Sequence, residues 1–307
     1  MRIYLDANAT TPVLPEVVAA MQPFWTEQFG NPSSSHTGGQ RTRSAVERAR
    51  GSVAKLLGCA PAEIVFTSGG TEGDNLALAG VLQPFLDRSE PAHLITSAIE
   101  HHAVLYAAES LEKRGVEVTY LQPNAAGVIP AEALEAALKP HSRLVSLMLA
   151  NNETGAIQPV GKLARIARAN GALFHTDAVQ AAGKLSLDLA GEFKNVDLLT
   201  LSGHKMYAPQ GTGVQFIRKG LQLAPLFHGG PHERGRRAGT ENVPGIVGLG
   251  AAADLARLWL AAEGPAQLHR LRDHLEAGLL ATIPGAHLNA AGAPPHAQYH
   301  QPAPGRH

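Results

Sequence analysis

Between residues 60 and 217 the chain alternates short apolar runs with segments of helical periodicity, and this alternation constrains the fold most. The runs are nearly continuous in Val, Ile, Leu and Phe, as strands buried on both faces are. Strands that alternate with helices form a mostly parallel sheet with helices on both faces, so we predict an α/β fold with seven strands. The predicted strands are 63–68, 93–99, 116–121, 143–150, 172–176, 196–202 and 213–217, and the predicted helices are 38–57, 72–86, 102–114, 130–138 and 160–169.

At 307 residues the chain can form one large domain and part of a second. We expect the large domain at 16–243 and a partial small domain made of 1–15 and 244–288, because 244–281 is rich in Ala and Leu and has helical patterns of its own. Residues 289–307 have no periodicity and few large apolar residues, which is typical of a disordered tail. The tail histidines fit no recognised metal-site spacing: His296, His300 and His307.

Composition and charge narrow the functional classes. Lys plus Arg and Asp plus Glu both number 26, and no basic stretch pairs with aromatic residues, so we expect no nucleic-acid partner. The N-terminus has no apolar signal segment, and no apolar run reaches the roughly 18 residues of a membrane-spanning helix. The single cysteine, Cys59, excludes a disulfide framework within the chain and fits a reducing cytoplasm. We therefore expect a cytoplasmic protein with no membrane partner.

In open α/β sheets, ligands bind outside the carboxyl ends of the strands, so the residues that follow each strand are the candidates. After the first strand comes the glycine-rich stretch 69–75, which leads into a helix. Glycines before a helix N-terminus let backbone N–H groups reach an anion, and the helix dipole favours a phosphate there. Gly70 and Thr71 are the candidate phosphate ligands. The alternative is an ordinary strand–helix turn that Thr71 caps.

Two further strand ends carry imidazole and amide groups. His101, after the second strand, could stack on a flat ligand or transfer protons; the alternative is an ordinary loop histidine. Asn152, after 143–150, could bind a carboxylate or a phenolic oxygen; the alternative is turn chemistry, to which Asn and Gly are well suited.

Asp177 and Lys205 follow two other strands. A carboxylate that ends a buried strand is costly unless it is paired, and a protonated pyridine nitrogen would pair with Asp177. An N-cap role for Asp177 is the alternative. A lysine forms a Schiff base when desolvation or neighbouring cations keep its amine neutral, and Lys205 stands at the end of 196–202. Taken alone, Lys205 could equally be a surface lysine.

One ligand needs all of these groups together. Pyridoxal 5′-phosphate has a phosphate for a helix N-terminus, a flat ring for a histidine, a pyridine nitrogen for an acid and an aldehyde for a lysine. We therefore predict a pyridoxal-phosphate site at the carboxyl edge of the sheet.

At these residues the chain resembles the cysteine desulfurases, pyridoxal-phosphate enzymes of fold type I in the class V aminotransferase group. The segments that carry the resemblance are YLDANATTP (4–12), FGNPSSSH (29–36), TSGGTEGDN (67–75), EHHAV (100–104), NNETG (151–155), HTDAVQAAGK (175–184), SGHKMYAPQGTG (202–213) and GGPHERGRRAGTEN (229–242). The resemblance covers residues 1 to about 289. It implies a sulfurtransferase of sulfur metabolism that converts L-cysteine to L-alanine and passes the sulfur to an enzyme thiol and then to an acceptor.

The resemblance also implies roles for single residues. Lys205 resembles the Schiff-base lysine, and His101 resembles the histidine that stacks on the ring and serves as an acid or base. Asp177 should pair with the pyridine nitrogen and Gln180 with the ring hydroxyl, while Asn152 should contact the substrate carboxylate or the cofactor. The residues expected to hold the phosphate are Gly70, Thr71, Ser202 and His204.

Partners follow from the same resemblance. Thr240 resembles the threonine that reaches the phosphate of the partner subunit, so a homodimer is implied. Arg237, in the loop that precedes it, should lie near the shared site and contact the substrate. The resemblance allows a sulfur-acceptor or scaffold protein as a further partner, and leaves iron–sulfur cluster assembly, tRNA thiolation and cofactor synthesis open as destinations for the sulfur.

The chain departs from the family after about residue 289. The family's nucleophilic cysteine and an arginine that grips the substrate carboxylate would both lie beyond that point, so we expect a truncated or altered enzyme with impaired sulfur transfer. Cys59 lies between a helix end and a strand start, away from the expected cofactor, and we predict a structural role for it. The Ala/Pro/Gly/His-rich tail also suggests an out-of-frame reading, which sequencing the DNA beyond codon 289 would test.

Two other functional readings stay open at this point. One is another class V pyridoxal-phosphate enzyme, such as a selenocysteine lyase or an aminotransferase, which also needs a carboxylate-binding arginine. The other is a catalytically silent protein that only dimerises or binds partners.

Overall fold

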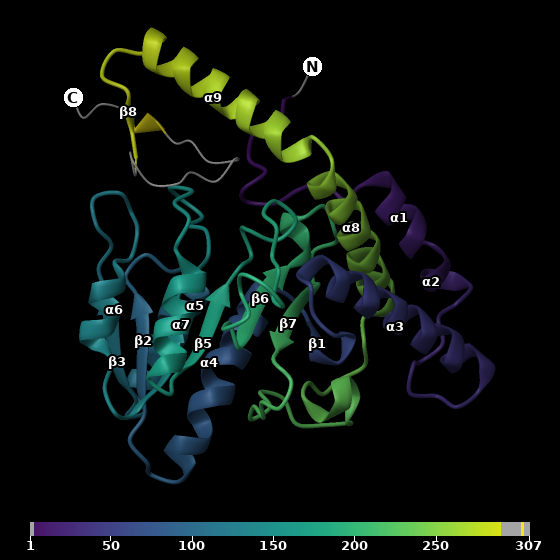
Figure 1. Ribbon diagram of the computed structural model, residues 1–307. Coiled ribbons are helices and arrows are strands. Elements are labelled where there is room, and N and C mark those ends of the chain that lie inside the picture. Colours follow the sequence, from purple (N-terminus) through teal and green to yellow (C-terminus); the bar gives the residue numbers. More distant parts are fainter. Residues whose placement is uncertain (1–2, 290–301, 304–307) are drawn as a thin grey trace.

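A seven-stranded sheet forms the centre of the computed structural model, which describes residues 3–289 and 302–303 (Figure 1). The spatial order is β1-β7-β6-β5-β4-β2-β3, and only β7 runs antiparallel to its neighbours. The predicted α/β class and the seven predicted strands are confirmed, with shifts of a few residues at the ends. The strands are β1 (Ile64–Thr67), β2 (His93–Ser97), β3 (Glu117–Leu121), β4 (Ser142–Ser146), β5 (Leu173–Asp177), β6 (Leu198–Ser202) and β7 (Gly213–Ile217).

Helices cover both faces of the sheet because successive strand residues point to opposite sides. Val65 packs into the apolar cluster on one face, and its neighbour Phe66 packs into the cluster on the other. On the Val65 side lie α4 (Gly70–Asp87) and α5 (His102–Glu112). The Phe66 side is covered by α3 (Thr37–Leu57), α6 (Ala131–Ala137) and α7 (Val160–Ala169). All five were predicted as helices.

The helix α8 (Val243–Ala261) lies against α3, and its N-terminal half belongs to the same apolar core. By length and apolar composition, α8 is the one helix in the described part of the chain that could cross a membrane, with a mean hydropathy of 1.3 over its most apolar window. The sequence expectation concerned an uninterrupted apolar run of about 18 residues, and Asp254 and Arg257 interrupt the run in α8. The packing against α3 accounts for its composition, since a core helix needs the same apolar residues as a membrane helix.

The crossing of α3 and α8 depends on Gly250, where a Cβ atom would lie 2.6 Å from both Cα and Cβ of Ala49. We expect Gly250→Ala to lower the free energy of unfolding by about 1–3 kcal/mol, because the two helix backbones must separate. Gly51, on α3, is the matched control because nothing lies within 4 Å of its added Cβ. Gly51→Ala should stabilise by about 0.5–1 kcal/mol in a urea titration, and equal effects at the two positions would contradict this packing.

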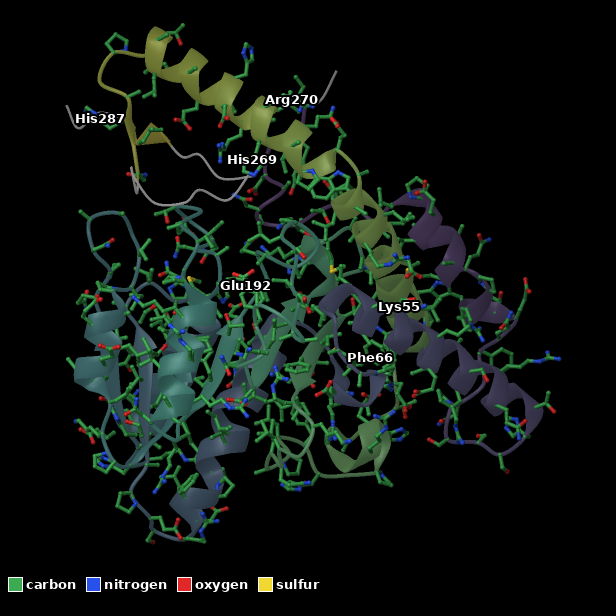
Figure 2. All side chains as sticks on the ribbon, viewed as in Figure 1. Lys55, Phe66, Glu192, His269, Arg270 and His287 are labelled. Carbon is green, nitrogen blue, oxygen red and sulfur yellow. The ribbon has the colours of Figure 1, made fainter. Side chains whose placement is uncertain are left out.

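The remaining elements lie around this body. Two short helices, α1 (Pro15–Met21) and α2 (Pro23–Thr26), precede α3 and were not predicted. After α8, α9 (Gly264–Thr282) lies outside the apolar core and has no buried residue, and its His269 and Arg270 side chains project from it (Figure 2). The strand β8 (His287–Leu288) pairs antiparallel with β9 (Pro302–Ala303). The rest of the predicted tail, including its three histidines, lies outside the described residues, and the predicted domain boundaries stay predictions.

Candidate active site

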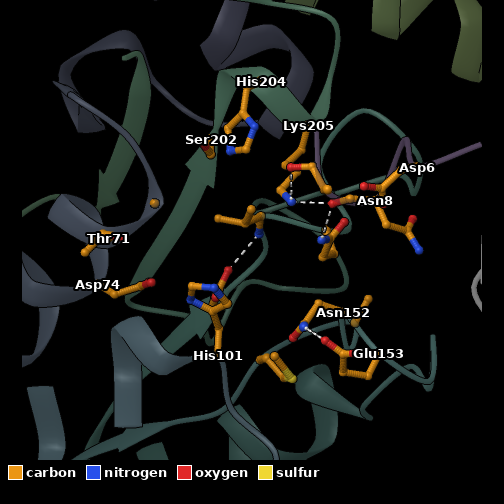
Figure 3. A pocket seen from close by; sticks show the side chains of 17 residues that line it. Asp6, Asn8, Thr71, Asp74, His101, Asn152, Glu153, Ser202, His204 and Lys205 are labelled. Carbon is orange, nitrogen blue, oxygen red and sulfur yellow. Dashed lines mark hydrogen bonds between the residues drawn. The ribbon is translucent and has the colours of Figure 1, made fainter. Parts of the chain in front are cut away.

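A cavity of about 460 Å³ opens at the carboxyl edge of the sheet, where the parallel strands end (Figure 3). Its walls come from the segments that follow five strands and from the N-terminal residues Asp6, Asn8 and Ala9. Most of the residues predicted for the site lie together here. They are Gly70, Thr71, His101, Asn152, Asp177, Gln180, Ser202, His204 and Lys205.

The first wall is the N-terminus of α4, an 18-residue helix that begins at Gly70. Its N-cap residue is Gly69, which has no side chain to satisfy the free N–H groups of the first turn, so an anion can accept them. The backbone approach is close, because a Cβ on Gly70 would lie 2.8 Å from Cγ2 of Val179. Thr71 is exposed at this turn and Ser202 is buried at the end of β6. This wall therefore fits a phosphate.

Buried acids form the floor of the cavity. Asp177, at the end of β5, is 6% exposed, and its Oδ1 accepts a 2.8 Å hydrogen bond from the Val179 N–H. Burial raises the pKa of Asp177 to about 6. Asp74, on α4, is 1% exposed, and its Oδ1 has no hydrogen-bond partner among the residues that the structure describes. Burial and the charge of Asp177 raise the pKa of Asp74. Nε2 of His175 lies 3.7 Å from Oδ1 of Asp74, but burial lowers the pKa of His175 to about 3, so that ring is neutral. Among the residues that the structure describes, no cation forms an ion pair with Asp74 or Asp177, and the floor therefore fits a cationic ring nitrogen.

His101 is the N-cap residue of α5, and its Nδ1 accepts a hydrogen bond of 3.1 Å from the Ala103 N–H. This bond places the proton of the neutral ring on Nε2. Burial, together with the positive charges of His102 and Lys205, lowers the pKa of His101. The side chain is therefore a neutral imidazole near neutral pH, with its Nε2–H free of the helix.

Lys205 lies just after β6, in the short 3-10 helix η2 (Gly203–Lys205). Its Nζ donates to the backbone carbonyl of Asn8 and, at 2.9 Å, to that of Ala9 (Figure 3). Burial lowers the pKa of Lys205, and the charges of Asp177 and Asp6 oppose this shift. A lysine whose pKa is lowered has more of its amine in the neutral, nucleophilic form.

Three more side chains complete the cavity. His204 faces the N-terminal segment, with its Nδ1 at 3.1 Å from Oγ1 of Thr10, and burial lowers its pKa. Asn152 donates from its side-chain amide to Glu153 at 2.8 Å, so it lies at the rim as an amide available to a ligand. Gln180 is buried, and its Nε2 donates to the Asn8 carbonyl at 3.2 Å.

Two predicted site residues lie elsewhere in the protomer. Arg237 makes two hydrogen bonds, of 2.9 and 3.2 Å, to the carboxylate of Glu72. Thr240 is exposed and lines a separate, smaller cavity that it shares with Arg237. The structure does not bring either residue to the cavity that holds Lys205.

Cys59 also lies away from the site. It packs against the apolar core just after the C-cap residue of α3, and it is absent from the walls of the main cavity. Burial and the charge of Glu63 raise the pKa of its thiol to about 12. A thiol with such a pKa has almost no thiolate at neutral pH and is a poor nucleophile.

Sequence reasoning assigned no role to several residues of the site. Asp74 stands in the quoted segment TSGGTEGDN, and Asp6 and Asn8 stand in YLDANATTP, but none was singled out. Asp74 falls within a predicted helix, but the burial that makes its carboxylate need a partner could not be deduced from the sequence. The contacts of Asn8 and Ala9 with Lys205 join residues almost 200 positions apart and gave no local signal.

Comparison with known proteins places this arrangement in a family. The model of the family described as aminotransferase class-V matches residues 3–299. The chain belongs to this family. Two relatives are 50% identical to it over 287 residues, which make up 94% of this chain and 70% of each relative: cysteine desulfurase 2 of Trichormus variabilis and cysteine desulfurase IscS of Methanosarcina thermophila.

Comparison with solved structures gives relatives of the same fold. One described as a NifS-like protein superposes with a TM-score of 0.89 at 42% identity, over 94% of this chain and 77% of its own. Another, described as SspA in complex with cysteine, has a TM-score of 0.80 at 42% identity, over 82% of this chain and 72% of its own. The chain is thus a cysteine desulfurase-like, pyridoxal-phosphate-dependent member of the class-V aminotransferases, and it spans about 70% of the length of the relatives it matches.

Proposed function

We propose that this chain holds pyridoxal 5′-phosphate in the 460 Å³ cavity and binds L-cysteine beside it. The observation that carries the proposal is the convergence on one cavity of a helix N-terminus, two buried acids and a lysine of lowered pKa. The relatives named cysteine desulfurase, and the relative solved with cysteine, support L-cysteine as the substrate.

Each wall has a part in this proposal. The first turn of α4 and the side chains of Thr71, Ser202 and His204 bind the phosphate, and Asp177 pairs with the ring nitrogen. When bound, the cofactor supplies an aldehyde for covalent attachment and a ring that withdraws electrons from the substrate. Lys205 provides the amine for attachment. His101 stacks on the ring and donates a hydrogen bond from its free Nε2–H near the substrate. Asn152 orients the substrate carboxylate from the rim.

The sulfur-accepting thiol is the part that this chain does not provide near the cavity. Cys59 is the only cysteine of the chain, and it is excluded by its position and its pKa of about 12. We therefore propose that the chain binds cysteine but transfers sulfur poorly. Impaired transfer distinguishes this proposal from that of a fully active desulfurase.

Sulfide release tests this proposal. The holoprotein, incubated with L-cysteine and a reductant, should change its visible spectrum and yet release sulfide no faster than free cofactor does. D-cysteine is the control for specific binding. Repeated turnover would contradict impaired transfer. If that turnover disappeared in Cys59→Ser, Cys59 would be the nucleophile. If it persisted in Cys59→Ser, no cysteine of this chain would be needed. No spectral change with L-cysteine would contradict the substrate.

We also propose a cytoplasmic homodimer. Thr240 is exposed and lies outside the cavity of its own protomer, as a residue that reaches a partner's phosphate must. Arg237, held by Glu72, positions the same loop rather than contacting the substrate within one protomer. In a complete desulfurase reaction, a sulfur-acceptor protein would take the sulfur, a step that we expect this chain to support poorly.

A further inference from the structure

Lys184 is a buried lysine close to the cavity that has no part in the proposal above. It is 5% exposed and lies in the segment after β5, one residue beyond Gly183, which has a φ of 74°. Its Nζ donates to the backbone carbonyl of Gln180 at 3.1 Å and to the Oε1 atom of Gln180 at 3.3 Å. No carboxylate lies within 4 Å of this amine in the described part of the chain, so its partners are these two neutral oxygens.

Gln180 connects Lys184 to the cavity. Its Oε1 faces Lys184, and its Nε2 donates to the Asn8 carbonyl, which also accepts from Nζ of Lys205. Four residues thus form one chain of hydrogen bonds from a buried lysine to the lysine in the cavity. Gln180 takes part in that chain with both ends of its side-chain amide, whereas Asn8 takes part only through its backbone carbonyl.

The direction of the Gln180 amide follows from its neighbours. An ammonium group can only donate, so the carbonyl end of the amide must face Lys184. A backbone carbonyl can only accept, so the NH₂ end must face Asn8 and the cavity. Without Lys184, the carbonyl end would lose its buried donor, and only the 3.2 Å hydrogen bond to the Asn8 carbonyl would hold the amide in this orientation.

The amine of Lys184 is costly for the fold. Burial and the charge of Lys205 together lower its pKa to about 7. A methionine of similar length would fill the space without that penalty, since apolar side chains often replace buried charged groups with no loss of stability. What the amine adds is the pair of hydrogen bonds to Gln180, which packing alone does not require.

We propose that Lys184 is a positioning residue: it holds the carbonyl end of Gln180 so that the amide N–H groups face the cavity and donate to the ring oxygen of the bound cofactor. This inference rests on the proposed function, because the acceptor is a group of the cofactor. Lys184 itself touches neither cofactor nor substrate and acts only through Gln180.

A pH titration of the visible spectrum of the holoprotein tests this role. In Lys184→Met, the ring oxygen loses a correctly oriented donor, and this loss favours the protonated form of the bond between Lys205 and the cofactor. We expect the midpoint of the titration to rise by about one pH unit and cofactor affinity to fall about tenfold. Lys55→Met, at an exposed position on α3, is the matched control and should leave both unchanged.

A double variant that changes both Lys184 and Gln180 separates a positioning role of Lys184 from a general effect of its charge. Gln180→Leu should raise the midpoint as well, and the double variant should resemble Gln180→Leu alone, because Lys184 then has no amide to hold. Additive shifts would overturn the proposal, and so would a lower melting temperature of Lys184→Met with an unchanged midpoint.

Further variants of Lys184 and the spectrum of the unmutated protein complete the test. Lys184→Arg keeps donors at this position, where an adjoining cavity of about 520 Å³ leaves room, and should restore the midpoint toward that of the unmutated protein. If Lys184→Met does not fold, Lys184→Gln and Lys184→Arg give the same comparison. A missing Lys205-dependent band in the unmutated protein would contradict the proposed function, whereas a normal band with a midpoint insensitive to Lys184 would contradict only this inference.

Discussion

Replacing Lys205 with alanine should remove the visible absorbance band of the holoprotein completely. Among the residues that the structure describes, Lys205 is the only lysine in the wall of the cavity, and it lies at the end of a strand of the sheet. Without it, the cofactor keeps its phosphate and ring contacts but loses its covalent bond. We expect cofactor retained through dialysis to fall by more than about 100-fold, since covalent attachment is lost while polar contacts remain.

The measurement is the absorbance spectrum of dialysed protein, with total cofactor determined after denaturation. Lys205→Arg keeps the positive charge that donates to Asn8 and Ala9 but cannot form the bond, so it should also lack the band. Lys162→Ala, at an exposed position on α7, is the matched control and should keep it. A band that survives in Lys205→Ala would contradict the proposed function at its central residue.

Asp177→Asn should make the protein without cofactor more stable and should weaken the binding of the cofactor. In the folded protein without cofactor, burial raises the pKa of Asp177 to about 6 from an ordinary 3.8. The folded state therefore binds this proton more tightly than the unfolded state, and the resulting stability is present at low pH and is lost as pH rises through about 6. Asparagine does not ionise, so the apoprotein carrying it should be more stable at pH 8 by about 1–3 kcal/mol.

The bound cofactor reverses this preference. A protonated ring nitrogen supplies the cation that buried Asp177 lacks, and asparagine cannot match the attraction, so affinity should fall about 10- to 100-fold. Thermal melts at pH 5 and pH 8, with and without cofactor, measure both effects, and Asp87→Asn at the exposed end of α4 serves as control. An asparagine variant that is less stable than the unmutated apoprotein at pH 8 would show that the carboxylate is already satisfied without a ligand.

The sequence predicted the sheet well because its strands are buried on both faces and stand out as apolar runs. It could not predict that β7 runs antiparallel, since GVQFI is apolar whichever way the strand points. The helices α1 and α2 were missed because α1 is seven residues long and α2 only four, too short for a periodicity to show.

The sequence predicted the position of the candidate residues at strand ends but missed those that act through other residues. Asp177 and Lys205 follow their strands directly, so their place at the carboxyl edge could be deduced from the order of elements. The roles of Lys184 and Asp74 depend on the burial of their side chains, and that burial results from packing that no local sequence pattern encodes. Arg237 was expected near the substrate, but its pairing with Glu72 depends on how a long loop returns to α4.

The unreactive thiol of Cys59 has a practical consequence for spectroscopy. Because burial raises the pKa of Cys59 to about 12 and the chain has no second cysteine, we expect little background labelling by maleimide dyes at neutral pH. A cysteine introduced at Gly278, where an added Cβ meets nothing within 4 Å, would be the one labelled site on α9. A single fluorophore there would report by energy transfer how far this helix stands from the cofactor, with no need to remove a native residue first.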